Sequence, residues 1–123
     1  MIQPGNGVTT DEAAEILGVT RHGVYMATMR GALPRYGNTR GRDFDRTEVE
    51  SRSLALWNRR EPHQYWVTTR GAAEILGLHR TGVRHLVETD RLPVVLDSTG
   101  RHAFRRHQVE NIAAAREART LRA

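Results

Sequence analysis

An internal repeat constrains the fold of this chain more than any other feature of its sequence. Residues 8–42 align with residues 67–101 at an offset of 59, and 16 of these 35 positions are identical. After one inserted residue the match continues at an offset of 60, from Phe44 and Phe104 onward. We therefore expect two copies of one unit of about 50 residues. The predicted organisation is a first copy at 1–57, a linker at 58–66 that contains Pro62, and a second copy at 67–123.

Each copy begins with the signals of two short helices separated by a glycine. Thr9 and Glu12 match a capping box, and the apolar residues that follow recur at helical spacing. Gly18 can end this helix because glycine adopts the left-handed conformation at little cost, and Thr20 can cap a second helix. The predicted helices are 10–17 and 21–30 in the first copy, and 70–76 and 80–89 in the second copy.

A β-hairpin and a further helix are expected after each helix pair. In the first copy, glycines bound a turn between two short flanks that are able to form strands. Asp45 with Glu48 then resembles the N-cap of a third helix. The predicted hairpins are 35–44 and 94–104, and the predicted helices are 45–57 and about 107–121. The sequence therefore predicts a mainly α-helical fold with small β-hairpins.

These motifs resemble the excisionase-type branch of the MerR-like winged helix-turn-helix superfamily. The first copy carries the pattern in Ala13–Arg21, Val24, Tyr25 and Gly31–Pro34, and the second copy carries it in Ala72–Arg80, Val83 and Arg91–Pro93. The resemblance covers most of the chain. It implies a tandem duplicated winged helix-turn-helix, in which the second helix of each copy enters the major groove of DNA.

The two copies differ late in this second helix. The family usually has large apolar residues there, and the chain has Leu86 and Val87 in the second copy but Ala27 and Thr28 in the first. We therefore expect the first copy to be loosely packed or to fill the gap with an aromatic residue near the linker. The candidates for this packing are Trp57, Tyr65 and Trp66.

The positive charge of the chain is carried entirely by arginine. The sequence has 19 arginines, no lysine and a formal net charge of +5, and the charge is spread over both copies without a basic tail. Codon usage in a high-GC genome is one explanation. The other, compatible explanation is that guanidinium groups suit phosphate oxygens and guanine edges. The charge is consistent with a nucleic-acid partner but does not establish one.

The predicted DNA contacts lie on the second helices and in the wings. Because Val24 and Val83 should face the cores, the opposite helix faces should reach base edges, and the wing arginines should reach the backbone or the minor groove. The predicted DNA-binding residues are Arg21, His22, Tyr25, Met26, Arg40 and Arg42 in the first copy, and Arg80, Thr81, Arg84, His85, Arg101 and Arg105 or Arg106 in the second. The alternative is that these arginines neutralise nearby glutamates or are solvated turn residues. Since the two sets differ, we expect an asymmetric pair of DNA elements about one helical turn apart.

Other functional classes find little support in the sequence. The chain has no cysteine, so it has no disulfide, thiolate nucleophile or cysteine-ligated zinc. Its six histidines show no metal-ligand spacing, and no phosphate loop or nucleophile elbow occurs, so we expect no metal, cofactor or catalytic residue. No stretch reaches the roughly 20 apolar residues of a membrane span, and the N-terminus lacks the pattern of an export signal. We therefore expect a cytoplasmic protein.

The sequence thus predicts a sequence-specific protein for double-stranded DNA that is not an enzyme. We expect a small transcriptional regulator that acts as a monomer with an internal pseudo-dimer and contacts the transcription machinery. One alternative is an excisionase-like recombination directionality factor that bends DNA and recruits an integrase. Another is a protein-binding adaptor, for which the aromatic residues around the linker would form the binding surface, unless they only pack the two small cores together.

Overall fold

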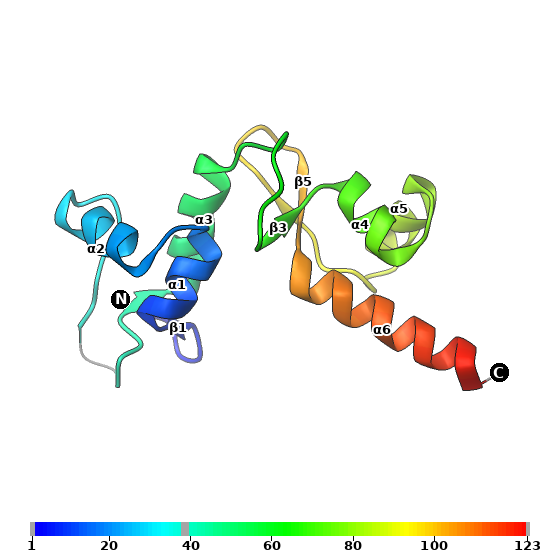
Figure 1. Cartoon of the computed structure of the whole chain (residues 1–123), viewed down its shortest axis with the longest axis horizontal. Coiled ribbons are helices and arrows are strands. Elements are labelled where there is room, and N and C mark those ends of the chain that lie inside the picture. The colour runs from blue at the N-terminus through cyan, green and yellow to red at the C-terminus, as the bar shows by residue number, and fades with distance from the viewer. Residues whose placement is uncertain (1, 38–39, 123) are drawn as a thin grey trace. The chain divides into compact units, whose positions relative to one another are not determined.

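The computed structural model describes residues 2–37 and 40–122. The chain is mainly helical with small antiparallel sheets, and it divides into two compact units, Met1–Asn58 and Arg59–Ala123 (Figure 1). Residues 59–66, which we expected to form most of a linker, are part of the second unit in this division. In the described part of the chain, no helix combines the length and the apolar character that crossing a membrane requires.

The first unit places three helices around one short sheet. Its elements are β1 (Gly7–Val8), α1 (Thr10–Leu17), α2 (Arg21–Met29), β2 (Phe44–Asp45) and α3 (Arg46–Leu56). β1 and β2 pair antiparallel, with Val8 opposite Phe44, and α1 packs against both α2 and α3. The largest fully buried side chains of this unit are Phe44, Ile16, Val8, Val24, Val49 and Ser53. The hydroxyl of Ser53 donates a hydrogen bond to the carbonyl oxygen of Ile16, which joins α3 to α1 inside the core.

Local signals fix the ends of α1 and α2 as predicted. The Thr9 hydroxyl accepts a hydrogen bond from the backbone N–H of Glu12 at 3.1 Å, and Gly18 ends α1 with a φ of +71°. The Thr20 hydroxyl caps α2 by accepting from the N–H of Gly23 at 3.1 Å. A Cβ atom on Gly23, in the first turn of α2, would lie 3.0 Å from the Cβ atom of Val19, so a larger residue here would press against the turn between the two helices.

The hairpin predicted at 35–44 is wrong for the described residues, because β2 pairs with β1 instead. One backbone hydrogen bond, from the N–H of Tyr36 to the carbonyl of Asp43 at 2.8 Å, joins the two sides of this loop. The left-handed φ angles of Gly37, Arg40 and Gly41 leave too few extended residues for two strands. Asn38 and Thr39, at the predicted turn, lie outside the described residues.

The cap predicted for α3 is confirmed in its position but not in its hydrogen bond. Asp45 occupies the N-cap position but makes no side-chain cap hydrogen bond, and its carboxylate instead accepts from the side-chain amide of Asn6. The Asn6 carbonyl accepts from the N–H of Arg46 at 2.9 Å, so pairing with the β1 segment satisfies the start of α3. Glu48 accepts from the hydroxyl of Tyr36, and this hydrogen bond raises the pKa of Tyr36.

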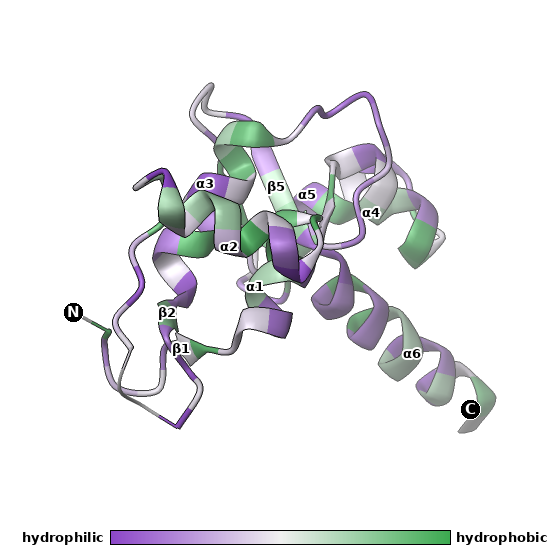
Figure 2. Ribbon diagram, turned by 60° about the vertical axis from the view of Figure 1, so that its left-hand side comes forward, coloured by the Kyte–Doolittle hydropathy of each residue, from purple (hydrophilic) through white to green (hydrophobic). Residues whose placement is uncertain are grey.

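The second unit contains the predicted helices and the predicted hairpin. Its elements are β3 (Trp66–Val67), α4 (Thr69–Leu76), α5 (Arg80–Glu88), β4 (Val95–Leu96), β5 (His102–Arg105) and α6 (Arg106–Arg122). The strands form an antiparallel sheet in the order β3-β5-β4, with Val95 opposite Ala103 in the hairpin. Its core contains Val67, Ala72, Ala73, Val83, Leu86, Leu92, Phe104 and Val109. Figure 2 shows hydrophobic and hydrophilic residues alternating along α6. On this helix Val109 belongs to the core, Ile112 packs against it, and Leu121 is exposed.

The aromatic residues before α4 are buried. The rings of Tyr65 and Trp66 meet edge to face with centroids 4.9 Å apart, and Trp66 lies opposite Arg105 in the sheet. The exposed protein-binding surface that we considered for these two residues is therefore wrong. Their physical role is packing, because two large rings at the edge of a small sheet remove much apolar surface from water.

Candidate nucleic-acid interface

The exposed face of α5 is polar and cationic. Val83 and Leu86 are buried in the core, whereas the four residues predicted to contact DNA are exposed. These are Arg80, Thr81, Arg84 and His85. A ring nitrogen of His79 accepts from the N–H of Thr81 at 3.2 Å and caps the helix. The helix therefore presents two guanidinium groups, a hydroxyl and an imidazole on its exposed face.

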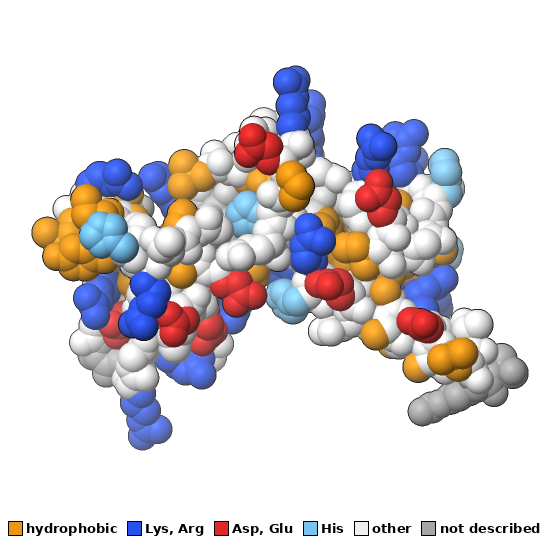
Figure 3. All heavy atoms as spheres, viewed as in Figure 1, with side chains coloured by type: hydrophobic (Ala, Val, Ile, Leu, Met, Phe, Trp, Pro, Cys, Tyr) orange, Lys and Arg blue, Asp and Glu red, His pale blue; other side chains and the backbone are white. Residues whose placement is uncertain are grey.

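The equivalent face of α2 is largely apolar. Val24 and Ala27 are buried, and Arg21, His22, Tyr25 and Met26 are exposed as predicted. Tyr25 is 51% exposed, and Met29, which we did not predict as part of this face, is 66% exposed. Of the seven exposed large hydrophobic residues in the described part of the chain, Tyr25, Met26 and Met29 lie on α2 and Val19 lies in the turn before it. Figure 3 shows hydrophobic side chains gathered beside a histidine at this end of the first unit.

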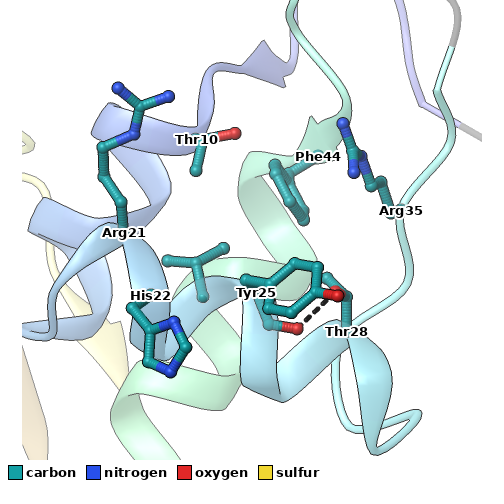
Figure 4. Close-up of a pocket in the computed structure, with 8 residues that line it drawn as sticks. Thr10, Arg21, His22, Tyr25, Thr28, Arg35 and Phe44 are labelled. Atoms are coloured by element: carbon teal, nitrogen blue, oxygen red, sulfur yellow. Dashed lines mark hydrogen bonds between the residues drawn. The ribbon is translucent and has the colours of Figure 1, made fainter.

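A pocket of about 330 Å³ opens beside α2 (Figure 4). Its lining is Thr10, Arg21, His22, Val24, Tyr25, Thr28, Arg35 and Phe44. Figure 4 shows Arg21 and Arg35 on opposite sides of it, and the Thr28 hydroxyl donates to the carbonyl of Tyr25 at 2.6 Å. Thr28 stands where the second unit has Val87.

The predicted wing arginines of the first unit have different surroundings. Arg40 is exposed and has a φ of +56°. The guanidinium of Arg42 donates to the carbonyl oxygen of Gly7 at 3.2 Å and lies 3.9 Å from the carboxylate of Glu12. Arg42 is thus engaged with its own unit.

In the second unit, the hairpin turn is held by one carboxylate. Oδ1 of Asp97 accepts from the Thr99 hydroxyl at 2.6 Å, from the Thr99 N–H at 2.9 Å and from the Arg101 N–H at 3.0 Å. Oδ2 of Asp97 lies 2.9 Å from Nη1 of Arg59. The hydrogen bond from the Thr99 hydroxyl is the largest cause that lowers the pKa of Asp97 to about 2, and the backbone hydrogen bonds and Arg59 add to it.

Arg101 and Arg105 lie in different places. Arg101 follows the turn and is exposed, as a wing contact requires. Arg105 is half-buried, and its guanidinium carbon lies 5.8 Å from the centre of the Trp66 ring. Arg106, the alternative to it, donates to the carbonyl of His63 at 2.9 Å. The sheet therefore holds both of these arginines away from the turn, since Arg105 pairs with β3 and Arg106 begins α6.

A concave surface of about 500 Å³ brings arginines together from four segments of the second unit. It is lined by Arg59, Arg60, Thr68, Thr69, Arg70, Arg80, Arg101 and His102. Two of these were predicted as DNA contacts, Arg80 and Arg101, and no aspartate or glutamate is part of the lining. We name this surface the arginine concavity.

Sequence reasoning missed Arg59, Arg60 and Arg70. The first two lie in the predicted linker, and Arg70 aligns with an acid, Asp11, in the first copy. The available signals are the Arg59–Arg60 dipeptide and the reversal of charge between positions 11 and 70.

The interface offers electrostatic and hydrogen-bonding recognition. Among the described residues, no group of three or more histidine, aspartate or glutamate side chains could hold a metal ion. Guanidinium groups around a hollow suit phosphate oxygens, and the exposed residues of α5 suit base edges. Comparison with known proteins finds no matching family model, no matching curated protein and no matching solved structure.

Proposed function

We propose that this chain is a sequence-specific duplex-DNA-binding protein made of two tandem helix-turn-helix units, of which the second has a β-hairpin wing, and that it acts as a small transcriptional regulator. The observation that carries the proposal is the exposed face of α5, where Arg80, Thr81, Arg84 and His85 lie opposite the buried Val83 and Leu86. In this role the protein works as one chain in the cytoplasm and needs no cofactor or catalytic residue.

The proposed mechanism is insertion of α5 into the major groove. The groove is about 12 Å wide and an α-helix with its side chains is about 10–12 Å across, so one helix fills it. Arg84, one turn from the start of the helix, can place two N–H groups on O6 and N7 of guanine. Thr81 and His85 supply further hydrogen bonds on the same face, and Arg80 meets the phosphates beside the groove.

In this proposal the first unit supplies a second recognition helix, α2, whose exposed residues differ chemically from those of α5. The contacts that we propose for it come from His22, Tyr25 and Met26 on α2 and from Arg40, whereas Arg21 and Arg42 are paired with acids of their own unit. Because its helix face is apolar where α5 is cationic, the target is an asymmetric pair of elements.

A second candidate is an excisionase-like recombination directionality factor. The exposed apolar face of α2, formed by Tyr25, Met26 and Met29, favours it, because such a patch suits a protein partner such as an integrase. In that case the second unit binds DNA and the first unit recruits the partner.

Selection from a random duplex library at near-physiological salt tests the proposal. We expect enrichment of a bipartite, asymmetric motif with elements about one helical turn apart. Arg84→Ala should remove the preference at one guanine, equivalent to about 1–3 kcal/mol, and leave the other element unchanged. Arg119→Ala, on α6, is the matched control. A pool without enriched sequence contradicts sequence-specific readout, and a motif with one element supports the second candidate.

A further inference from the structure

Two helices of nearly the same sequence begin with opposite charges. α1 begins with Thr10, Asp11 and Glu12, whereas α4 begins with Thr69, Arg70 and Gly71. Position 11 aligns with position 70, and position 12 aligns with position 71. The second unit thus has an arginine and a glycine where the first unit has two acids.

In the first unit, the two acids neutralise the arginines around them. Oδ1 of Asp11 lies 3.3 Å from Nε of Arg21. The carboxylate of Glu12 lies 3.4 Å from Nη2 of Arg46 and 3.9 Å from Nη1 of Arg42. Arg21 and Arg42 are the counterparts of Arg80 and Arg101, which line the arginine concavity.

In the second unit, neither position 70 nor position 71 holds an acidic residue that could pair with the arginines nearby. Within the described ranges, neither Arg80 nor Arg101 lies in an ion pair with an aspartate or a glutamate. The guanidinium of Arg70 pairs with Glu74 at 3.6 Å, but Glu74 aligns with Glu15 of the first unit, so this acid does not distinguish the two units. The charge at positions 70 and 71 remains more positive by three than the charge at positions 11 and 12. Like charges are therefore gathered here at an electrostatic cost that an anion would relieve.

Arg59 positions one wall of the arginine concavity. It donates from Nη2 to the His102 carbonyl at 2.7 Å and from Nη1 to the carboxylate of Asp97 at 2.9 Å. Both partners belong to the hairpin, so the segment that carries Arg60 is fixed beside Arg101. The charge of Asp97 is already satisfied by Thr99, Arg101 and Arg59, so this carboxylate does not compete with a ligand for the guanidinium groups of Arg80 and Arg101.

From this geometry we infer that the arginine concavity is a phosphate-binding site that holds the nucleic-acid backbone. Arg60, Arg70, Arg80 and Arg101 contact the phosphates, and Arg59 is a positioning residue. The first unit has no counterpart, because Asp11 and Glu12 neutralise the equivalent arginines. The inference rests on the proposed function and adds that nearly all of the salt-dependent affinity resides in the second unit.

Arg70→Asp tests the inference by giving the second unit the charge pattern of the first. The substitution is expected to fold, because Arg70 is exposed and an aspartate in the first turn of a helix is favourable. It removes one phosphate contact and pairs Arg80 with Asp, as Arg21 is paired in the first unit. Each such contact contributes about fivefold to affinity at 0.15 M salt, so we expect a loss of about 10- to 30-fold and a log-log salt slope that is less steep by about 1 to 2.

The control is Arg119→Asp, which makes the same charge change on α6 of the same unit. Both variants and the wild type are measured by fluorescence anisotropy on the selected duplex and on a scrambled duplex. The expected result is an equal loss on both duplexes for Arg70→Asp and a loss of less than about threefold for Arg119→Asp. Equal losses of DNA affinity in the two variants would overturn the phosphate site, because they would show that only the net charge of the protein matters.

Titration with inorganic phosphate separates this inference from the proposed function. Backbone amide NMR signals of Thr69, Arg70 and Arg101 should shift in a saturable way in the wild type and not in Arg70→Asp. If the wild type binds no duplex, the proposed function is wrong. Saturable NMR shifts with inorganic phosphate would support the phosphate site even in that case. If no shifts occur at these residues, the phosphate site is overturned even where DNA binding is found.

Discussion

Nε of Arg21 lies 3.3 Å from Oδ1 of Asp11 in the first unit, whereas their counterparts in the second unit, Arg80 and Arg70, are both cations on one concave surface. The same helix pair thus presents a neutralised surface in one unit and a cationic surface in the other. A duplicated sequence pattern does not require duplicated chemistry, since the residues at two aligned positions, Asp11 and Glu12 against Arg70 and Gly71, decide the local charge.

Asp11→Asn should increase DNA affinity at a small cost in stability. Both side chains of the Asp11–Arg21 pair are 73% exposed, so loss of the ion pair should lower the free energy of unfolding by less than about 0.5 kcal/mol, and loss of the acid from the first turn of α1 should lower it by about 0.3–1 kcal/mol. The released Arg21 can contact a phosphate and raise the affinity by about fivefold at 0.15 M salt. Anisotropy titration measures the affinity, and urea denaturation measures the stability. Glu15→Gln is the control for the same charge change in the same helix, and an equal gain there contradicts a specific role for Asp11.

Thymine methyl groups should contribute to binding by the first unit. The apolar face of α2, with Tyr25 and Met26, can contact a C5-methyl group but offers no guanidinium pair for guanine. Replacing thymine by uracil in the element bound by α2 should weaken binding by about 0.8 kcal/mol, or about fourfold, for each contacted methyl. The same replacement in the element bound by α5 is the control. Equal effects at both elements would show that α2 does not read these methyl groups.

Thr68→Ala should destabilise the second unit by about 1 kcal/mol. The Thr68 hydroxyl accepts from the N–H of Gly71 at 3.1 Å, and removing it leaves that donor at the start of α4 without its partner. Urea denaturation followed by circular dichroism measures the loss. Thr68→Ser keeps the hydroxyl and should retain most of the stability, whereas equal losses in the two variants would point to the methyl group.

Stability should fall in acid through Asp97. Its pKa is lowered from 3.8 to about 2, so the folded state binds this proton more weakly than the unfolded state does. The stabilisation is therefore fully present above about pH 4 and is lost as the pH falls toward 2. Urea denaturation between pH 2 and pH 5 should show a shallower pH dependence for Asp97→Asn than for the wild type. Identical slopes would mean that Asp97 does not cause this part of the acid sensitivity.

The helices could be predicted because their signals are local. Thr9 and Gly18 bound α1, and Thr68 and Gly77 bound α4, through hydrogen bonds that reach no more than five residues along the chain. The alternation of buried and exposed residues on α5 could be predicted for the same reason, since helical periodicity alone separates Val83 from Arg84.

The strands of the first unit could not be predicted in this way. β2 pairs with β1, which lies more than 30 residues earlier, and not with the nearer flank of its own loop. Asp45 follows the same long-range pairing, because its carboxylate meets Asn6 from the other strand segment. Strand pairing depends on which segments the helices bring together, and no local pattern encodes that choice.

The sequence by itself determined the two-part organisation, the helix boundaries and which residues of α2 and α5 are exposed, because repeats, caps and periodicity act over short stretches of chain. Only the tertiary structure decided that Arg59 and Arg60 meet Arg70, Arg80 and Arg101 around one hollow. These residues come from segments separated by up to 42 positions, and their charges act together only after the sheet and the helices have packed.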